Sequence, residues 1–363
     1  MIKIATVFSG IGSVEHALIR MKLEHKIIFA CDNGDIEINE DNIICKLNEY
    51  PKMDYVNRKK IVDDVYNDSK KTNFVKKTYF ENYKISEYDF HNNIKFLDGN
   101  QYKNQVDLLV GGSPCQSFST MGYQKGLEDS RGTLFYEFAR LVKEIEPKVF
   151  IYENVQGLLH HDKGKTWSII SEIFKSLGYF YKFKILNSKD YGIPQNRNRL
   201  FVVGFKNKKY FNKFEFPQEI KLKSTLQDYL IEYCKEGSFS FESKIFDPGV
   251  VDEKYFLSDK VTKHVLSVGT KNYVTIPKTD LTIARPLLAT MHKMHRAGVD
   301  NYITIEGKLR RLTPRECLRL MGYEDYFKQV VSDTQMYHQT GNSIVVNIFI
   351  YLLNEIIKTE VFN

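Results

Sequence analysis

The fold and the site are organised around Gly111-Gly112-Ser113-Pro114-Cys115-Gln116-Ser117-Phe118-Ser119, which follows the short apolar run 106–110. This run predicts a buried strand, and in open α/β sheets ligands bind outside the carboxyl ends of strands. Glycines let the backbone approach a ligand closely, and proline stiffens the turn. Cys115 therefore stands where a nucleophile is useful, because a thiolate is reactive and its pKa is tunable. A free cysteine is usually a small buried hydrophobe, and we keep that interpretation for Cys31, Cys45, Cys234 and Cys317.

The composition is that of an ordinary globular protein with a basic bias. The chain has 363 residues, of which 42% are hydrophobic and 27% charged, and its formal net charge is +7. This length can bury a substantial core in one large domain or two, and the charge fits a polyanionic partner without requiring one. Scattered cysteines without a C-x-x-C pair argue against a disulfide framework and a structural zinc site, so we expect no metal. We see neither a signal peptide nor an apolar run long enough to span a membrane, and expect a cytoplasmic protein without membrane contact.

The first 33 residues predict an adenosine-containing cofactor. A strand over 3–8 leads into Ser9-Gly10-Ile11-Gly12-Ser13, and helical spacing follows from Val14 to Met21. A strand, a glycine turn and a helix open a nucleotide-type α/β unit, although Gly-x-Gly alone is a weak signal that a plain tight turn would also give. A second strand over 27–31 ends at Asp32, about 20 residues after the glycine turn, where an acid commonly binds ribose hydroxyls.

Three later side chains fit the same site. The strand predicted over 149–152 ends at Glu153, and a carboxylate at a strand exit near a cysteine is a natural acid or hydrogen-bond partner. Arg197 and Arg199 alternate on a predicted strand and therefore point the same way. Two guanidinium groups on one face suit a phosphate or a base carbonyl, and a salt-bridged surface pair is the alternative.

Taken together and in order, these blocks resemble the DNA (cytosine-5) methyltransferases. The resemblance extends from Phe8 to Ile344, and only the region between the arginine block and Arg311 is matched by position alone. The matching blocks are Phe8-Ser9-Gly10-x-Gly12, the loop around Cys115, Glu153-Asn154-Val155, Gln195-x-Arg197-x-Arg199, Arg310-x-Leu312-Thr313-Pro314-Arg315-Glu316 and Gln339-Thr340-Gly341-Asn342-Ser343.

The resemblance implies an α/β fold with two domains. Residues 1–205 and 303–363 would form a Rossmann-like methyltransferase sheet that binds S-adenosylmethionine. Residues 206–302 would form a smaller, mostly β and irregular target-recognition domain. A polar segment at about 42–86 is expected to be a solvated insertion, with DNA backbone contact as a minor alternative.

The resemblance also implies the cofactor S-adenosylmethionine, with S-adenosylhomocysteine as product. The family often has a bulky apolar residue after the second-strand acid, where this chain has Asn33. Asp89-Phe90 is expected to close a third strand and to meet the adenine amino group. The residues expected at the cofactor are Phe8, Ser9, Gly10, Ile11, Gly12, Ser13, Asp32, Asn33, Asp89, Phe90, Pro114, Leu134, Asn342 and Ser343.

The implied reaction is methyl transfer to C5 of a cytosine that has been flipped out of double-stranded DNA. Cys115 would add to C6, Glu153 would donate to N3, Arg199 would hold O2, and Arg197 would support the loop or backbone. The segment 121–132 matches the family's mobile loop that closes over DNA. The residues expected to contact DNA are Gln116, Ser117, Ser119, Arg131 and Gln195.

Three alternatives remain open at this stage. An enzyme of the same chemistry could act on tRNA, although the recognition region of roughly 85 residues is longer than that branch of the family usually carries. A catalytically silent DNA-binding homologue would not need the intact Cys115, Glu153 and Arg199. A nicotinamide oxidoreductase would give no role to the Pro-Cys-Gln loop. We expect a monomer that resembles the modification half of a restriction–modification pair, with a cognate endonuclease as functional partner.

Overall fold

The computed structural model describes residues 1–113, 134–233, 248–270 and 273–363. Within these residues the centre is a seven-stranded sheet of order β3-β2-β1-β4-β5-β7-β6. β1 to β5 run parallel, whereas β7 is antiparallel to both of its neighbours. The strands are β1 (Ile2–Val7), β2 (His25–Cys31), β3 (Phe90–His91), β4 (Leu108–Gly111), β5 (Val149–Val155), β6 (Phe180–Asn187) and β7 (Asn198–Phe205).

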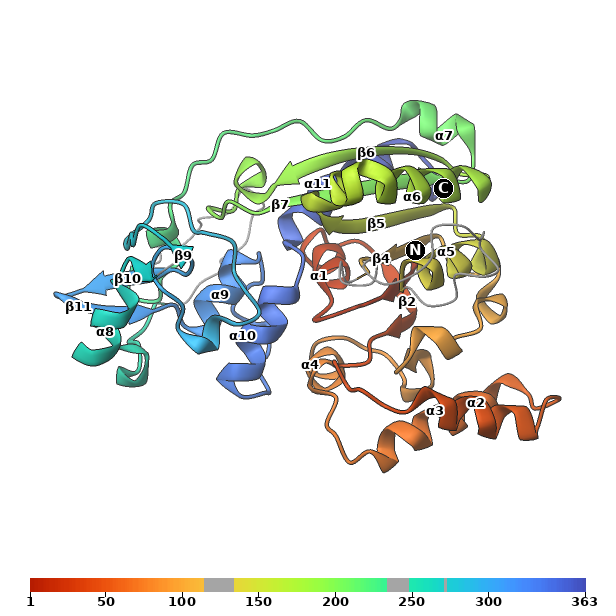
Figure 1. The fold of residues 1–363 in the computed structure, drawn as a ribbon. Coiled ribbons are helices and arrows are strands. Elements are labelled where there is room, and N and C mark those ends of the chain that lie inside the picture. Colours follow the sequence, from red (N-terminus) through yellow and green to blue (C-terminus); the bar gives the residue numbers. More distant parts are fainter. Residues whose placement is uncertain (114–133, 234–247, 271–272) are drawn as a thin grey trace.

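Helices cover both faces of the sheet (Figure 1). Successive strand residues face opposite sides, so Ile151 of β5 joins one hydrophobic cluster and its neighbours Phe150 and Tyr152 join the other. The first cluster lies under α1 (Ser13–Arg20), α4 (Phe74–Asn82) and α11 (Val346–Lys358), and the second under α5 (Leu134–Ile145) and α6 (Lys165–Ser176). The Rossmann-like architecture expected from the sequence is confirmed.

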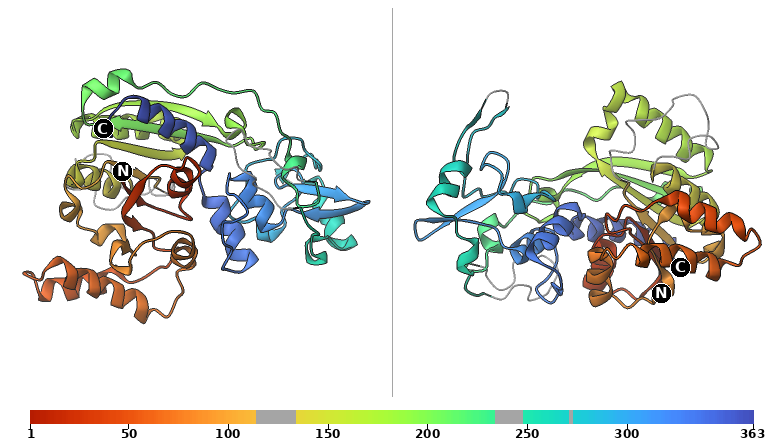
Figure 2. Two further views of the ribbon diagram at one scale, coloured as in Figure 1. Left: turned by 180° about the vertical axis from the view of Figure 1, so that it is seen from behind. Right: turned by 60° about the horizontal axis from the view of Figure 1, so that its bottom comes forward.

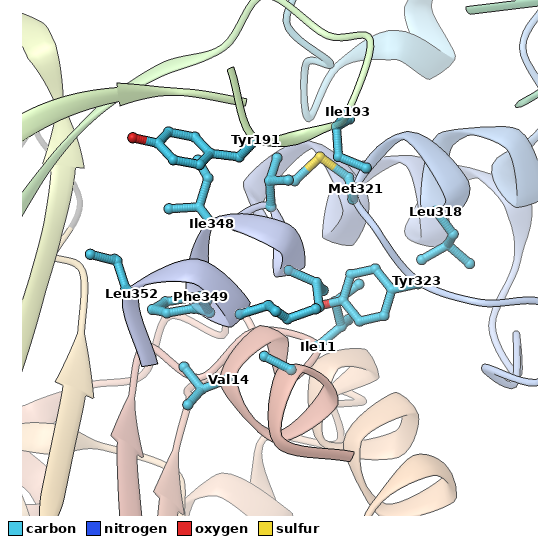
Figure 3. Close-up of a cluster of buried hydrophobic side chains, with 14 of the residues drawn as sticks. Ile11, Val14, Tyr191, Ile193, Leu318, Met321, Tyr323, Ile348, Phe349 and Leu352 are labelled. Atoms are coloured by element: carbon cyan, nitrogen blue, oxygen red, sulfur yellow. The ribbon is translucent and has the colours of Figure 1, made fainter. Parts of the chain in front are cut away.

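The first and last helices of the chain pack together beside β1. Figure 3 shows Ile11 just before α1 and Val14 in its first turn, with Phe349 and Leu352 of α11 beside them. This contact closes the chain on itself, and the N- and C-termini lie near each other in Figure 1. It also brings the end of α10 (Asp333–Asn342) next to the loop that follows β1, as the Ser13–Ser343 hydroxyl contact of 2.9 Å shows.

The predicted insertion consists of helices with two different roles. α2 (Glu40–Glu49) and α3 (Tyr55–Asp68) form a small core of their own around Ile43, Leu47 and Val62, at the bottom of Figure 1. α4, in contrast, belongs to the main core, because Tyr79 is fully buried there. The solvated insertion is therefore shorter than the sequence suggested.

A smaller region projects from one side of the sheet domain in every view (Figures 1 and 2). The predicted boundaries, 206 and 302, stay a prediction. Leu226 and Tyr229 pack in the main core, as do Leu287 and Ile303, and residue 302 opens the hairpin in which Tyr302 pairs with Arg311. The further elements are α7 (Lys208–Lys213), α8 (Asp259–Val265), β8 (Gly269–Thr270), β9 (Tyr273–Val274), β10 (Tyr302–Ile305) and β11 (Lys308–Arg311).

The return to the sheet domain begins with a well-capped helix. α9 (Pro314–Leu320) has Thr313 as its N-cap and a reciprocal bond from Glu316, as the sequence pattern predicted. Glu316 also pairs with the buried Arg310 at 2.7 Å.

The sequence predicts no membrane-spanning segment, and one segment of the structure is relevant to that prediction. Asp333–Lys358 is long and apolar enough to cross a membrane by composition, but 67% of its apolar window is buried inside the protein. We interpret it as part of the core, where α10 and α11 pack.

Candidate active site

The loop after β1 has an unusual backbone that opens the N-terminus of α1 to a ligand. Phe8, Gly10 and Gly12 have φ values of +53°, +53° and +75°. Glycine adopts this left-handed region freely, whereas Phe8 does so at a cost of about 1–3 kcal/mol, a kind of strain that clusters at functional sites. At Gly12 a Cβ would lie 2.2 Å from the ring of Tyr83. The loop thus fits only with glycine there, and it presents helix N–H groups suited to an anion.

The acid at the end of β2 is joined to this loop. Asp32 accepts hydrogen bonds from the backbone N–H of Gly10 at 2.9 Å and of Gly34 at 2.8 Å. Burial raises the pKa of Asp32, and these two donors oppose the shift. The carboxylate therefore organises the glycine loop, although Asp32 is not part of the described lining of the cavity below.

A cavity that is open to solvent lies at the carboxyl ends of β1 and β4. Its described lining consists of Thr6, Val7, Phe8, Ser9, Gly10, Ser13, Val14, Glu15, Val110, Gly111, Gly112, Glu153, Asn342, Ser343, Ile344 and Phe349.

Glu153 forms one end of this cavity and is held by Arg199. In the antiparallel pair β5–β7, Glu153 faces Phe201, so Arg199 is its diagonal neighbour on the same face. Arg199 Nε lies 3.1 Å from Glu153 Oε1. Burial raises the pKa of Glu153, and Arg199 and Arg197 counter that shift only in part. Contrary to the sequence-based expectation, Glu153 lies inside β5, which continues to Val155.

Gly112 makes room for this carboxylate. A Cβ at Gly112 would lie 2.9 Å from Glu153 Oε2 and 3.1 Å from the Glu153 carbonyl oxygen. Any larger residue would have to displace the side chain of Glu153.

Arg197 has a different environment from Arg199, although the sequence placed both on one strand. β7 begins at Asn198, and Arg197 precedes it. Its guanidinium donates to the carbonyl oxygens of Leu287, Gly341 and Ser343, each at 2.9 Å. Burial lowers the pKa of Arg197 to about 9, which leaves it charged at neutral pH. It supports the backbone of the smaller region and of the cavity wall.

The start of the nucleophile loop is anchored by β5. Asn154 donates to the carbonyl oxygen of Ser113 at 2.9 Å and to the Tyr152 hydroxyl at 2.8 Å. The Ser113 hydroxyl contacts the same Tyr152 oxygen at 2.8 Å. These bonds fix the chain one residue before Pro114. The predicted Pro114, Cys115, Gln116, Ser117, Ser119 and Arg131 lie outside the described residues.

Six of the other residues predicted at the cofactor lie together in the structure. Phe8, Ser9, Gly10, Ser13, Asn342 and Ser343 line the cavity. Gly12 caps α1, Ile11 is buried in the core beneath that helix, and Asn33 accepts from the N–H of Asp35 in the turn after β2. Leu134 packs against the cluster under α5 and is absent from the described lining.

The placement of Asp89 and Phe90 was wrong. Asp89 precedes β3 and its N–H and carboxylate bond to Ser86, while Phe90 opens the strand and is fully buried against Tyr79. The carboxyl end of β3 is instead followed by Asn92, whose oxygen accepts from Asn73 at 3.4 Å. The contact of Asp89 with adenine stays a prediction. Asp89 lies at the amino end of β3, whereas the prediction placed it at the carboxyl end.

Gln195 also differs from its expected role. It is fully buried, its Nε2 donates to the Leu320 carbonyl at 2.8 Å, and its Oε1 accepts from the Leu287 N–H at 3.0 Å. Both ends of the amide are taken by backbone, so the expected DNA contact of Gln195 is corrected to a structural one.

Sequence reasoning missed three residues of the site: Glu15, Gly112 as the neighbour of Glu153, and Asn154 as the anchor of Ser113. A helical position facing the sheet could have indicated Glu15, because a charged residue there needs a reason. The other two depend on side-chain geometry alone. Among the described residues, no three His, Cys, Asp or Glu side chains are grouped to hold a metal ion.

Comparison with known proteins places the chain in a family. The family model described as C-5 cytosine-specific DNA methylase matches residues 57–358. Type II methyltransferase M.HhaI of Haemophilus parahaemolyticus is 37% identical over 246 residues, which cover 68% of this chain and 74% of that protein. Type II methyltransferase M.SsoII of Shigella sonnei is 37% identical over 302 residues, covering 79% and 72%. The crystal structure of S. pombe Dnmt2 methyltransferase has the same fold, with a TM-score of 0.64, 18% identity and 99% coverage of both chains.

Proposed function

The chain belongs to the C-5 cytosine-specific DNA methylase family, and we propose that it methylates C5 of a flipped-out cytosine within a specific double-stranded DNA sequence. The observation that carries the proposal is the cavity that runs from the glycine loop to the Glu153–Arg199 pair. It joins a nucleotide-type binding loop to an acid beside the strand that leads to Cys115.

The residues present fit S-adenosylmethionine as the cofactor. When bound, this group supplies a methyl sulfonium. The Asp32 carboxylate suits the ribose hydroxyls, and the N–H groups at the start of α1 suit the methionine carboxylate. Asn342 and Ser343 add polar groups to the cavity lining, with Ser343 in contact with Ser13 at the start of α1.

Cys115 is proposed as the nucleophile. Its thiolate would add to C6 of the cytosine, and the electron pair of the C5–C6 double bond would form the new bond from C5 to the methyl group. The electron pair of the broken sulfur–methyl bond would stay on sulfur, with S-adenosylhomocysteine as the leaving group. A base then removes the C5 proton, the C5–C6 double bond re-forms, and the thiolate leaves. The anchoring of Ser113 by Asn154 supports this role, because it fixes one end of the loop.

Glu153 is proposed as the hydrogen-bond donor to N3. Donation requires a protonated carboxyl group, and burial raises the pKa of Glu153 in that direction. Because the protonated form is the active one, the rate falls as the pH rises through this raised pKa. Arg199 positions the carboxyl group and is placed to bind the base carbonyl O2.

The wider assignments follow from the family. We propose double-stranded DNA as substrate, read by the target-recognition region predicted over 206–302, and a cognate restriction endonuclease as functional partner. The net charge of +7 supports a polyanionic substrate. We also propose a monomer that acts in the cytoplasm.

The test is transfer of labelled methyl groups from S-adenosylmethionine to an unmethylated plasmid and, in parallel, to bulk tRNA. Wild type and Cys115→Ala are compared, and the product base is identified after digestion. Label at cytosine C5 of DNA, absent with Cys115→Ala, is the expected result. Label in tRNA alone would move the enzyme to RNA. No label in either, with cofactor binding intact, would identify a silent homologue.

A further inference from the structure

A second carboxylate lies in the cavity, and nothing so far gives it a role. Glu15 stands in the first turn of α1 and is fully buried. Its Oε1 accepts hydrogen bonds from the Tyr79 hydroxyl at 2.5 Å and the Thr6 hydroxyl at 2.8 Å. Its Oε2 is buried and has no hydrogen-bond partner among the described residues.

A buried carboxylate with one unbonded oxygen costs folding free energy unless a ligand supplies the missing hydrogen bond. A buried carboxylate oxygen without a donor loses its hydration and gains nothing in return. Burial accordingly raises the pKa of Glu15, against the effect of its own hydrogen bonds. The Tyr79 and Thr6 hydroxyls both donate to Oε1, so Glu15 acts as a hydrogen-bond acceptor there. The N-terminus of α1 also favours a negative charge at this position. The group is therefore prepared to accept one more donor at Oε2.

The position of Glu15 limits what that donor can be. Glu15 and Glu153 are the only charged side chains among the described residues that line the cavity. Glu153 is already paired with Arg199, whereas no described Lys or Arg lines the wall near Glu15. The described residues therefore supply no donor to Oε2, and a small cationic group on a ligand would suit it.

We propose that Glu15 Oε2 binds the α-ammonium group of the methionine portion of the cofactor. The inference rests on the proposed function, because it takes S-adenosylmethionine as the ligand. Ammonium and carboxylate groups stand on the same carbon of that ligand. Glu15 attracts the ammonium group and repels the carboxylate, which leaves the carboxylate to the N–H groups of the glycine loop and so fixes the orientation of the methionine portion.

Tyr79 offers a matched control. It contacts Glu15 only through Oε1, so Tyr79→Phe disturbs the same carboxylate and leaves Oε2 in place. A purely structural role of Glu15 predicts that Tyr79→Phe and Glu15→Gln affect ligand binding alike. A role at Oε2 predicts that only the Glu15 variant changes the recognition of the ammonium group.

The experiment measures dissociation constants by titration calorimetry for two probes. One is S-adenosylhomocysteine, and the other is its deaminated analogue, identical except that the amino group is replaced by hydrogen. We expect wild type and Tyr79→Phe to prefer S-adenosylhomocysteine by roughly 10- to 100-fold, the worth of a hydrogen bond between charged groups. Glu15→Gln should lose most of this preference while it binds the deaminated analogue as wild type does.

Each outcome bears on the inference. A folded Glu15→Gln that keeps the full preference overturns the role of Glu15, while binding of S-adenosylhomocysteine still supports the proposed function. Glu15→Asp, which withdraws the carboxylate by one methylene, serves as the second variant and should also lose preference. If neither variant folds, equal affinity of wild type for both probes overturns the inference. Failure of wild type to bind either probe refutes the proposed function as well.

Discussion

Replacing Gly112 by alanine should disable the enzyme without unfolding it. The added Cβ would lie 2.9 Å from Glu153 Oε2, whereas ordinary contact begins at 3.4 Å, so the carboxylate must move by about 0.5 Å. The added Cβ would also lie 3.1 Å from the Glu153 carbonyl oxygen, which gives way less easily because the Glu153 backbone is paired with Phe201 in the sheet. The carboxylate must therefore take most of the shift, and its 3.1 Å contact with Arg199 is then strained.

The size of the effect follows from these distances. A catalytic group misplaced by about 1 Å can cost about 100-fold in rate, so a shift of about half that distance should lower the single-turnover rate roughly 10-fold or more. The crowding itself should lower the free energy of unfolding by about 1–3 kcal/mol. Affinity for S-adenosylhomocysteine should stay near that of wild type, because the glycine loop after β1 is untouched.

The chain provides a matched control in Gly157. A Cβ there would have no atom within 4 Å, so Gly157→Ala should keep the wild-type rate and stability. The assay is single-turnover methyl transfer to DNA with saturating cofactor, with denaturant unfolding measured on the same samples. If Gly112→Ala methylates DNA as fast as Gly157→Ala, the close packing of Gly112 on Glu153 has no catalytic consequence and the reasoning fails.

Three further predictions follow from single contacts. Asn154→Ala removes the donor to the Ser113 carbonyl and should lower the methyl-transfer rate roughly 10-fold with cofactor affinity unchanged; an unchanged rate would show that this anchor does not hold the loop. Arg197→Met leaves three buried carbonyls unpaired and should lower the free energy of unfolding by about 2–4 kcal/mol, seen as a lower denaturant midpoint. Burial lowers the pKa of His16 from 6.5 to about 3. As the pH falls, the unfolded chain therefore takes up this proton before the folded protein does. The free energy of unfolding should decrease by about 1.4 kcal/mol per pH unit as the pH falls from about 6.5 to 3. His16→Gln should remove this contribution to the pH dependence of the free energy of unfolding.

The sequence was informative wherever a local rule determines the structure. The strand that leads to Gly111, the glycine turn after β1 and the cap of α9 at Thr313 all depend on neighbouring residues, and each is confirmed. The family blocks then located the acid and the arginines. None of these inferences needed knowledge of contacts between distant segments.

The failures occurred where distant contacts decide. β3 is only two residues long and follows the inserted helices, so no local pattern separates Asp89 before the strand from Asn92 after it. Gln195 carries a polar side chain in a polar stretch, yet Leu287 and Leu320 enclose it. Both residues are typical of surfaces by type, and only the packing of remote segments shows where each one lies.

The two arginines show how the site and the smaller region are linked. Arg199 contacts Glu153 at the end of the cavity proposed to be catalytic, and two residues earlier Arg197 binds the carbonyls of Leu287 and Ser343. Leu287 belongs to the region proposed to read DNA, and Ser343 lines the cavity proposed for the cofactor. Because a guanidinium presents several donors in a fixed plane, one side chain can hold both segments at set distances from the acid. A lysine has only a single ammonium group, so the arrangement explains why arginine is needed at position 197.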